Sequence, residues 1–133
     1  MQSLEEIRNF FDDDLFAKSL GITIDSAELG AAVCSVELTK NHLNALGSAQ
    51  GGLIFTLADL AFAAAANFGR GRVVTLESSV NFIALGKGSR LTAKATAISH
   101  GKHICVYDVP ITDEKGTKIA HAIFTGYVMK PFE

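Results

Sequence analysis

One segment limits the possible folds of this chain more than any other. Residues 53–67 read LIFTLADLAFAAAAN, an almost continuous apolar run that holds a single carboxylate, Asp59, near its centre. The run is followed by Gly69, a residue type common at helix ends, and is shorter than the roughly 20 residues that a membrane span needs. Because apolar residues occupy almost every face, we predict a helix over residues 53–67 that is buried on all sides.

Segments rich in β-branched and alternating residues predict a sheet around this helix. They predict two short strands or one bent hairpin over residues 22–39 and four consecutive strands over residues 73–83, 91–100, 104–112 and 118–129. The connectors between the four strands are short and contain glycine, which predicts an antiparallel meander. A capping box at Ser3 and Glu6 begins an amphipathic pattern that predicts one further helix, ending at Gly21. The sequence thus predicts one α+β domain spanning residues 1–133.

Charge, histidine and cysteine content limit the partners, cofactors and compartment. The chain is 48% hydrophobic and 20% charged, with a formal net charge of −2. Its scattered charges give no electrostatic footprint for nucleic acid or an anionic membrane, so we expect neither partner. His100 and His103 flank a turn without a third ligand, and we expect no metal site. Cys34 and Cys105 fall in predicted strands and no export signal is visible, so we expect buried reduced thiols in a cytoplasmic protein.

Asp59 is the first candidate for chemistry. A carboxylate on a helix that is apolar all round lies in a low-dielectric place, where its pKa rises unless a cation or several donors sit beside it. Such a group in a cleft is a candidate base or nucleophile. The alternative is a structural Asp that hydrogen-bonds loop amides or pairs with an arginine, and composition alone does not choose between the two.

Gly51 and Gly52 form the second candidate. Paired glycines at a helix entrance let a ligand approach the backbone, and the free N–H groups of the first turn favour developing negative charge, as an oxyanion hole requires. The alternative is a tight loop-to-helix turn. Asp59 lies seven residues after Gly52, about 10 Å along a helix, which is too far for both to engage one carbonyl. If they act together, the glycines of one chain must face Asp59 of another across a two-fold axis.

Residues 44–62, NALGSAQGGLIFTLADLAF, resemble the signature of hotdog-fold acyl-CoA thioesterases of the phenylacetate-degradation type. Residues 79–82 (SVNF) and 91–95 (LTAKA) resemble the same family, so the similarity runs over most of the chain. The resemblance implies a hotdog fold, in which a six-stranded antiparallel sheet wraps round one long central helix; the N-terminal helix is then an addition. It also implies homodimers joined edge to edge, often assembled as homotetramers.

The same resemblance implies roles for individual residues. Asp59 acts as general base or nucleophile on the thioester carbonyl, and the Gly51 amide helps to bind the oxyanion. Asn44 positions the loop or the attacking water, and Thr75 contacts that water from the partner chain. The implied reaction is hydrolysis of an acyl-CoA thioester to free acid and coenzyme A, with no metal or redox cofactor, since coenzyme A enters only as part of the substrate.

Gln50 departs from the family pattern, because many relatives carry His before the glycine pair. Gln still hydrogen-bonds the substrate carbonyl or the loop, but it does not exchange a proton near neutral pH. This departure counts against a hotdog hydratase, whose chemistry uses a His paired with an acid. Two alternatives to the thioesterase stay open: a non-catalytic acyl-CoA or fatty-acyl binding module in which Asp59 is structural, and the less favoured hydratase.

Some remaining side chains are candidates for substrate contacts. Loop cations, among them Arg70 and Arg90, could hold the nucleotide phosphates of coenzyme A by charge-assisted contacts. For any single cation, an ordinary charged surface is the simpler interpretation. Gly52, Phe55 and Phe82 are candidates for the pocket around the rest of the substrate.

Overall fold

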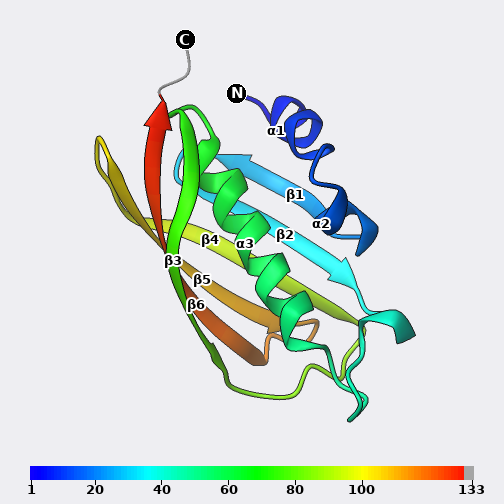
Figure 1. Cartoon of the computed structure of the whole chain (residues 1–133). Helices are drawn as coiled ribbons and strands as arrows, with labels where there is room; N and C mark the ends of the chain where they lie inside the picture. The colour runs from blue at the N-terminus through cyan, green and yellow to red at the C-terminus, as the bar shows by residue number, and fades with distance from the viewer. Residues whose placement is uncertain (131–133) are drawn as a thin grey trace.

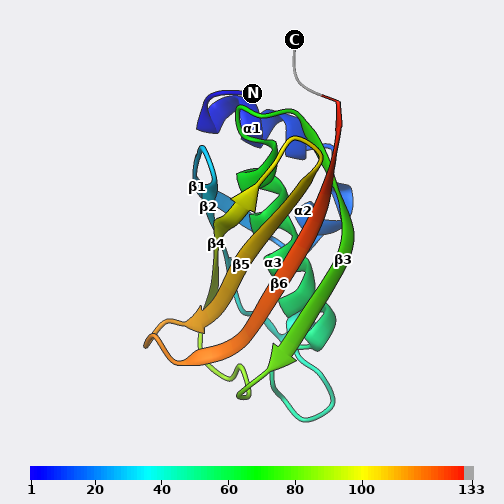
Figure 2. The ribbon, with the colours of Figure 1, turned by 90° about the vertical axis from the view of Figure 1, so that its left-hand side faces the viewer.

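The computed structural model describes residues 1–130 as a long helix lying across a curved antiparallel sheet (Figure 1). The strands are β1 (Thr23–Glu28), β2 (Ala31–Glu37), β3 (Arg72–Phe82), β4 (Arg90–His100), β5 (Ile104–Asp113) and β6 (Lys118–Lys130). The helices are α1 (Leu4–Phe11), α2 (Leu15–Ser19) and α3 (Gly51–Asn67), with a short 3-10 turn at Lys40–His42. Figure 2 shows the sheet curving round α3. The predicted six-stranded α+β architecture is confirmed.

The order of the strands in the sheet is β1-β2-β4-β5-β6-β3. The β1–β2 hairpin and the run β4-β5-β6 form as predicted, but β3 pairs with β6, and β4 pairs with β2. The predicted meander of four consecutive strands is therefore wrong for β3, whose following connector leads to the other half of the sheet. Strand patterns show which residues form strands, whereas the choice of neighbours depends on distant segments that a short connector does not fix.

The N-terminal helical segment is divided in two. Ser3 caps α1 by accepting a hydrogen bond from the Glu6 N–H, as the capping box predicts. The single helix predicted to end at Gly21 is interrupted, because Asp14 caps a second helix, α2. Asp favours N-cap positions over helix interiors, so the three aspartates at residues 12–14 break the predicted helix.

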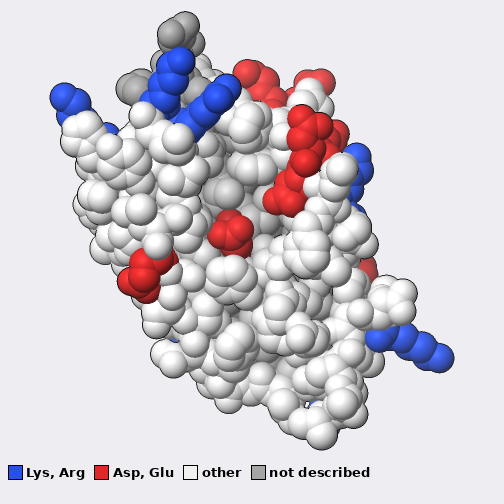
Figure 3. Space-filling model, in the orientation of Figure 1, with Lys and Arg blue, Asp and Glu red and all other residues white. Residues whose placement is uncertain are grey.

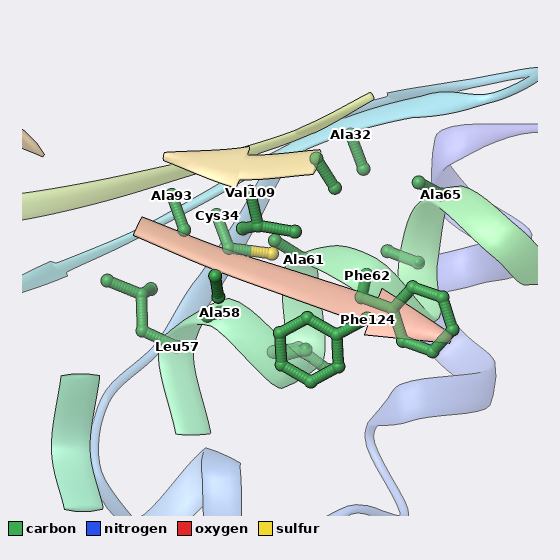
Figure 4. Close-up of a cluster of buried hydrophobic side chains, with 14 of the residues drawn as sticks. Ala32, Cys34, Leu57, Ala58, Ala61, Phe62, Ala65, Ala93, Val109 and Phe124 are labelled. Carbon is green, nitrogen blue, oxygen red and sulfur yellow. The ribbon is translucent and has the colours of Figure 1, made fainter. Parts of the chain in front are cut away.

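Alanines line the seam between α3 and the sheet. Ala58, Ala61 and Ala65 of α3 are buried in one cluster with Ala32 and Ala93 of the sheet (Figure 4). A methyl group needs little room, so α3 lies close to the strands that it covers. Protein interiors are packed to crystal-like density, and a larger side chain here would displace the helix. The seam therefore fixes the position of α3 and of every group that the helix carries.

Aromatic side chains fill a neighbouring part of the core. The Phe62 ring stacks on Phe124 with centroids 5.1 Å apart and meets the Tyr107 ring edge-on at 5.4 Å. Gly126 on β6 leaves room for this cluster, because a Cβ there would lie 2.7 Å from Phe62 and from Val73. A larger residue at position 126 would push Phe62 out of the stack.

Both cysteines are free and buried, as predicted. Burial raises the pKa of the Cys34 and Cys105 thiols, so both stay protonated at neutral pH. Within residues 1–130, no helix combines the length and the hydropathy that crossing a bilayer requires.

Candidate active site

One face of α3 is not covered by the rest of the single chain. Most of the helix is buried, but Gly52 and Phe55 are exposed, and Thr56, Asp59 and Ala63 are half-buried. These residues recur at helical spacing, so they form one open stripe. The prediction of a helix buried on all sides is therefore wrong here, because the sheet and the N-terminal helices cover only the other faces.

Asp59 lies at the middle of this open stripe. The Thr75 hydroxyl on β3 donates a hydrogen bond to Asp59 Oδ1 over 3.2 Å. Burial raises the pKa of Asp59 above its ordinary value, the Thr75 hydrogen bond lowers it, and the negative charge of Asp14, the N-cap of α2, raises it. The net change is upward, in the direction predicted for a carboxylate on an apolar helix. A half-buried carboxylate with a raised pKa suits proton transfer near neutral pH.

Thr75 differs from expectation in one respect. Its hydroxyl reaches Asp59 of its own chain, whereas the family resemblance implied a contact from the partner chain. The reason is that β3 begins a few residues after α3 ends and runs back along the helix (Figure 1). This contact needs no second subunit.

The start of α3 presents a single free amide. The helix begins at Gly51, two residues before the predicted start, and Gln50 is its N-cap, with a side-chain carbonyl that accepts from the Gly52 N–H. Among the described residues, the Gly51 N–H has no acceptor. The Phe82 ring lies against this glycine, since a Cβ at Gly51 would be 3.5 Å from the ring. A free N–H at a helix N-terminus, beside an apolar wall, can stabilise an oxyanion.

Asn44 shapes the loop that leads into α3. Its side-chain carbonyl accepts from the Leu46 and Ser48 N–H groups at 3.0 and 3.1 Å, and from Ser48 Oγ at 3.2 Å. The Asn44 N–H also donates to the Ser48 carbonyl over 2.7 Å. The Asn44 side chain is thus engaged within the loop, which favours loop positioning over water positioning for this residue.

The two arginines lie away from the open stripe and from each other. Arg90 is on the sheet face that points away from α3, where it pairs with Glu37 and lies 3.8 Å from Asp25. Arg70 follows the C-terminal end of α3 and lines a separate surface pocket with Lys102. The single chain therefore brings neither arginine to the predicted catalytic groups.

The histidines next to the β4–β5 turn each contact an aromatic residue. His100 Nδ1 is 2.8 Å from the Tyr107 hydroxyl, and the His103 ring stacks on Tyr127. Among residues 1–130, no three His, Cys, Asp or Glu side chains are grouped so that they could hold a metal ion. The described residues thus offer acid–base and amide groups at the site rather than a ligand set.

A single chain holds two half-sites. The helix α3 is continuous from Gly51 to Asn67, so Asp59 lies eight positions after Gly51, about 12 Å along the axis. Both groups cannot contact one carbonyl at hydrogen-bonding distance in this geometry, as their spacing in the sequence predicted. If both groups act on one carbonyl, one of them must come from a second chain.

The face that carries both half-sites is largely uncharged. Figure 3 shows lysines and arginines at the margins of this face and only isolated acidic groups over α3 and β3. β3 borders the face and lies at the edge of the sheet, next to β6. Val74, Leu76 and Phe82 on this strand are 44%, 56% and 57% exposed. A long edge strand with exposed apolar side chains is a surface suited to association.

Asp14 is a residue beside the site that the sequence reasoning missed. Its carboxylate accepts from the Ala17 N–H at 3.1 Å and so begins α2, which packs on α3. The run of aspartates at residues 12–14 was a signal for a helix start. Nothing local in the sequence showed that this helix start would act on Asp59.

Comparison with known proteins supplies the family. A family model described as the thioesterase superfamily matches residues 46–120, which hold all of α3, β3, β4 and β5. The acyl-coenzyme A thioesterase PaaI of Escherichia coli K12 is 37% identical over 111 residues, covering 83% of this chain and 79% of the relative. The chain belongs to the thioesterase superfamily.

Solved structures similar to this thioesterase agree with its fold. The PaaI protein of E. coli from the phenylacetic acid degradation operon superposes with a TM-score of 0.88 at 32% identity, covering 92% of this chain and 90% of that one. A hypothetical thioesterase of Streptococcus pneumoniae TIGR4, solved with coenzyme A, gives 0.83 at 31% identity, covering 92% and 99%. The predicted hotdog fold and the resemblance to thioesterases of the phenylacetate-degradation type are confirmed.

Proposed function

We propose that this thioesterase hydrolyses acyl-coenzyme A thioesters in a site shared by two subunits, with Asp59 of one subunit as base and the Gly51 amide of the other as oxyanion donor. The observation that carries the proposal is the continuous helix α3, which carries both groups yet separates them by two turns. The names of the E. coli relative and of the neighbour solved with coenzyme A support the choice of substrate.

The proposed reaction begins with a water molecule beside the Asp59 carboxylate and the Thr75 hydroxyl. Asp59 takes a proton from this water as the water oxygen attacks the thioester carbonyl carbon. The N–H of Gly51 of the partner subunit, aided by the helix dipole, stabilises the negative carbonyl oxygen. Collapse of this intermediate breaks the C–S bond, and the proton on Asp59 passes to the departing thiolate. The products are the free acid, coenzyme A and an ionised Asp59.

A second copy of the chain supplies the missing half-site in this proposal. β3 is an edge strand of 11 residues with exposed apolar side chains, and it borders α3. Two β3 strands paired antiparallel about a two-fold axis would extend the sheet and set the two α3 helices side by side in opposite directions. The start of each helix then faces the middle of the other. The homodimer is the minimum assembly, and two such dimers would form the homotetramer.

The first test removes the Gly51 N–H without disturbing the helix. Proline is favoured at the first helical position, and Gln50 before it already has the extended backbone that a proline requires, with φ −66° and ψ 138°. Gly51→Pro should keep α3 folded and lower kcat by about 10²- to 10³-fold, the usual loss for one oxyanion donor. Gly51→Ala keeps the N–H, and its methyl group would meet the Phe82 ring at an ordinary 3.5 Å, so it is the matched control. Thiol release from a panel of short, medium, long and aryl acyl-CoAs measures both variants.

Mixing two inactive variants tests whether the site is shared. Asp59→Asn removes the base and should lower kcat by about 10²- to 10⁴-fold. A mixed dimer of Asp59→Asn and Gly51→Pro chains has one site with both intact groups and one with neither, so random mixing should restore about a quarter of the wild-type sites. Mixing that restores nothing contradicts the shared site. Acyl-CoA binding by the wild type without thiol release contradicts hydrolysis and favours the acyl-CoA binding module.

Isotope labelling separates a base from a nucleophile at Asp59. In a single turnover in water enriched in oxygen-18, a general base leaves its own carboxylate unlabelled, and the label enters the released acid. Mass spectrometry of the peptide that contains Asp59 reads the result. A labelled carboxylate would show that Asp59 attacks the thioester directly.

We also propose that the enzyme is cytoplasmic and needs no metal or redox cofactor. The two free, buried cysteines suit a reducing compartment, and each step above uses only a group of the chain, water or the substrate. Thiol release should therefore be unchanged after dialysis against a chelator. A loss of activity that added metal restores would contradict this part of the proposal.

A further inference from the structure

His42 is a buried polar side chain with both ring nitrogens engaged. It ends the short 3-10 turn at Lys40–His42 and is only 7% exposed. Its Nδ1 accepts a hydrogen bond from the Thr39 N–H over 3.0 Å, so the proton of the neutral ring is on Nε2. Nε2 then donates to the Leu20 carbonyl over 2.7 Å. The imidazole is therefore held in one orientation and one tautomer.

The Leu20 carbonyl belongs to the end of α2. Leu20 is the C-cap of this helix, and the last carbonyls of a helix have no partner within the helix itself. The His42 ring supplies a partner from 22 residues further along the chain. The ring therefore fastens the turn at Lys40–His42 to the end of α2.

The backbone of His42 holds the entrance of α3. The Gln50 N–H donates to the His42 carbonyl over 2.8 Å. Gln50 is the N-cap of α3, and its side chain accepts from the Gly52 N–H, so Gly51 between them keeps the free amide. The contacts thus run without a break from Leu20 through His42 and Gln50 to the Gly51 amide.

The loop between His42 and Gln50 has contacts of two kinds. Within the loop, Leu43 pairs with Ala49 in an isolated β-bridge and the Asn44 side chain bonds to loop amides, which fixes the shape of the loop. Outside it, the Ala49 N–H donates to the Gly86 carbonyl over 2.8 Å, and the His42 ring docks on α2. The outside contacts fix where the loop lies. Position matters to a reaction, because a displacement of about 1 Å can cost about 10²-fold in rate.

We propose that His42 is a positioning residue for the Gly51 amide, which it holds in place by docking the loop on α2. The same short helix acts on Asp59 through Asp14 at its start, and on the amide through Leu20 at its end. In the shared site, the base and the amide of one subunit serve different active sites, so each α2 supports both sites of the dimer. This inference rests on the proposed hydrolysis and adds a residue that acts without touching the substrate.

Two substitutions separate the contacts of the His42 ring. The amide nitrogen of glutamine is as many bonds from Cα as Nε2 of histidine, so His42→Gln keeps a donor for the Leu20 carbonyl. The side-chain oxygen of asparagine corresponds to Nδ1, so His42→Asn keeps the acceptor for Thr39 and loses the contact with α2. We expect His42→Asn to lower kcat for thiol release by about 10- to 100-fold with KM within about twofold, and His42→Gln to stay within about threefold of wild type. Equal losses in the two variants would overturn the proposal.

A double-mutant cycle tests whether His42 acts through Gly51. Gly51→Pro has already lost the amide hydrogen, so adding His42→Asn should lower kcat by less than about twofold more. A further loss as large as that of His42→Asn alone would show a general structural role and contradict the proposal. His42→Ala, which buries no new polar group, enters the same cycle if His42→Asn does not fold. Loss of folding in both variants would assign His42 to folding and would also contradict it.

Hydrogen exchange keeps this test separate from hydrolysis. If the wild type releases no thiol, the proposed function fails, but the Gln50 N–H still reports how firmly the entrance of α3 is held, because it donates to the His42 carbonyl. His42→Asn should speed exchange of this amide by about tenfold or more relative to the Val109 amide of β5, and His42→Gln should not. Nuclear magnetic resonance measures both amides. Equal exchange of the Gln50 amide in wild type and His42→Asn would exclude the positioning role.

Discussion

The sheet has one edge on each flank of α3, and the two edge strands, β3 and β1, differ in how well they are covered. On one flank, β3 ends the sheet with 11 residues and exposed Val74 and Leu76. On the other flank, β1 ends the sheet with only 6 residues, carries Asp25 and Glu28, and packs against α1 (Figure 1). Short strands, charges and covering helices protect a sheet edge from association. β1 is short and packs against α1, whereas β3 is long, so β3 is the edge at which we propose that a second copy pairs.

Each flank also contributes one group that shifts the pKa of the Asp59 carboxylate. β3 brings the Thr75 hydroxyl, whose hydrogen bond lowers the pKa of the carboxylate, and α2 brings Asp14, whose charge raises it. Burial is the largest influence on this pKa, and the two flanks adjust it in opposite directions. The pKa of Asp59 is therefore shifted from both sides of the helix.

Among variants that compare the two flanks, the largest expected effect comes from disrupting the β3 edge. Lysines in place of Val74 and Leu76 would bring four positive charges to a β3–β3 interface, two from each copy. Both side chains are exposed in the single chain, so the subunit should stay folded. We expect the V74K/L76K variant to be monomeric in light scattering and to lose about 10²- to 10³-fold in kcat, because the Gly51 amide of the partner subunit is removed. A monomer with wild-type kcat would show that one chain completes the site.

Variants that shift the pKa of Asp59 in opposite directions compare the two flanks directly. Hydrolysis needs the ionised Asp59, so kcat/KM should rise with pH through the pKa of this group and then level off. Asp14→Asn removes a like charge but keeps an N-cap, so the rise should move to lower pH. Thr75→Val removes the donor to the carboxylate, so the rise should move to higher pH.

pH–rate profiles of these variants provide the measurement. Asp13→Asn removes a neighbouring exposed charge and is the matched control for Asp14→Asn. An equal shift in Asp13→Asn would assign the effect to net charge rather than to the α2 flank. Shifts of Asp14→Asn and Thr75→Val in the same direction would contradict the opposed roles of the two flanks.

A smaller effect is expected on folding. Because the pKa of Asp59 is raised in the folded state, the stability linked to this group is fully present below its ordinary pKa and is lost as pH rises through the raised value. Asp59→Asn is neutral at every pH, so it should melt at a higher temperature than wild type at about pH 7, and this gain should shrink towards about pH 3. Calorimetry at both pH values measures the difference. A gain that does not change with pH would contradict the raised pKa.

The smallest effect is expected at the protected edge. Ser26 is exposed on β1, and Ser26→Lys should change the free energy of unfolding by less than about 0.5 kcal/mol. Urea unfolding, light scattering and thiol release should all match the wild type. A monomeric Ser26→Lys protein would move the subunit interface from β3 to β1.

Local patterns predicted most of the fold. The strand predicted over residues 91–100 is observed as Arg90–His100, and the helix predicted over residues 53–67 begins two residues earlier because Gln50 caps it. Alternation, helical spacing and capping are properties of neighbouring residues, so a sequence displays them directly. Asp59 and the glycine pair became candidates for the same reason, since a lone carboxylate in an apolar helix and two glycines at its entrance are visible in the sequence.

What the sequence did not display depends on contacts between distant segments. The pairing of β3 with β6, the docking of α2 beside Asp59 and the open stripe of α3 are all decided by which elements become neighbours. No local pattern encodes such choices. The break between α1 and α2 is different, because the aspartates at residues 12–14 carried a local signal that the longer amphipathic pattern outweighed.

The alanine seam between α3 and the sheet affects how this protein can evolve. A mutation that adds volume at Ala58 or Ala61 would move the whole helix, and the base and the amide would move with it. The positions of the proposed catalytic groups therefore depend on alanine side chains that take no part in the reaction. Variation is better tolerated at the exposed ends of the molecule, where loops and the short N-terminal helices accept larger side chains.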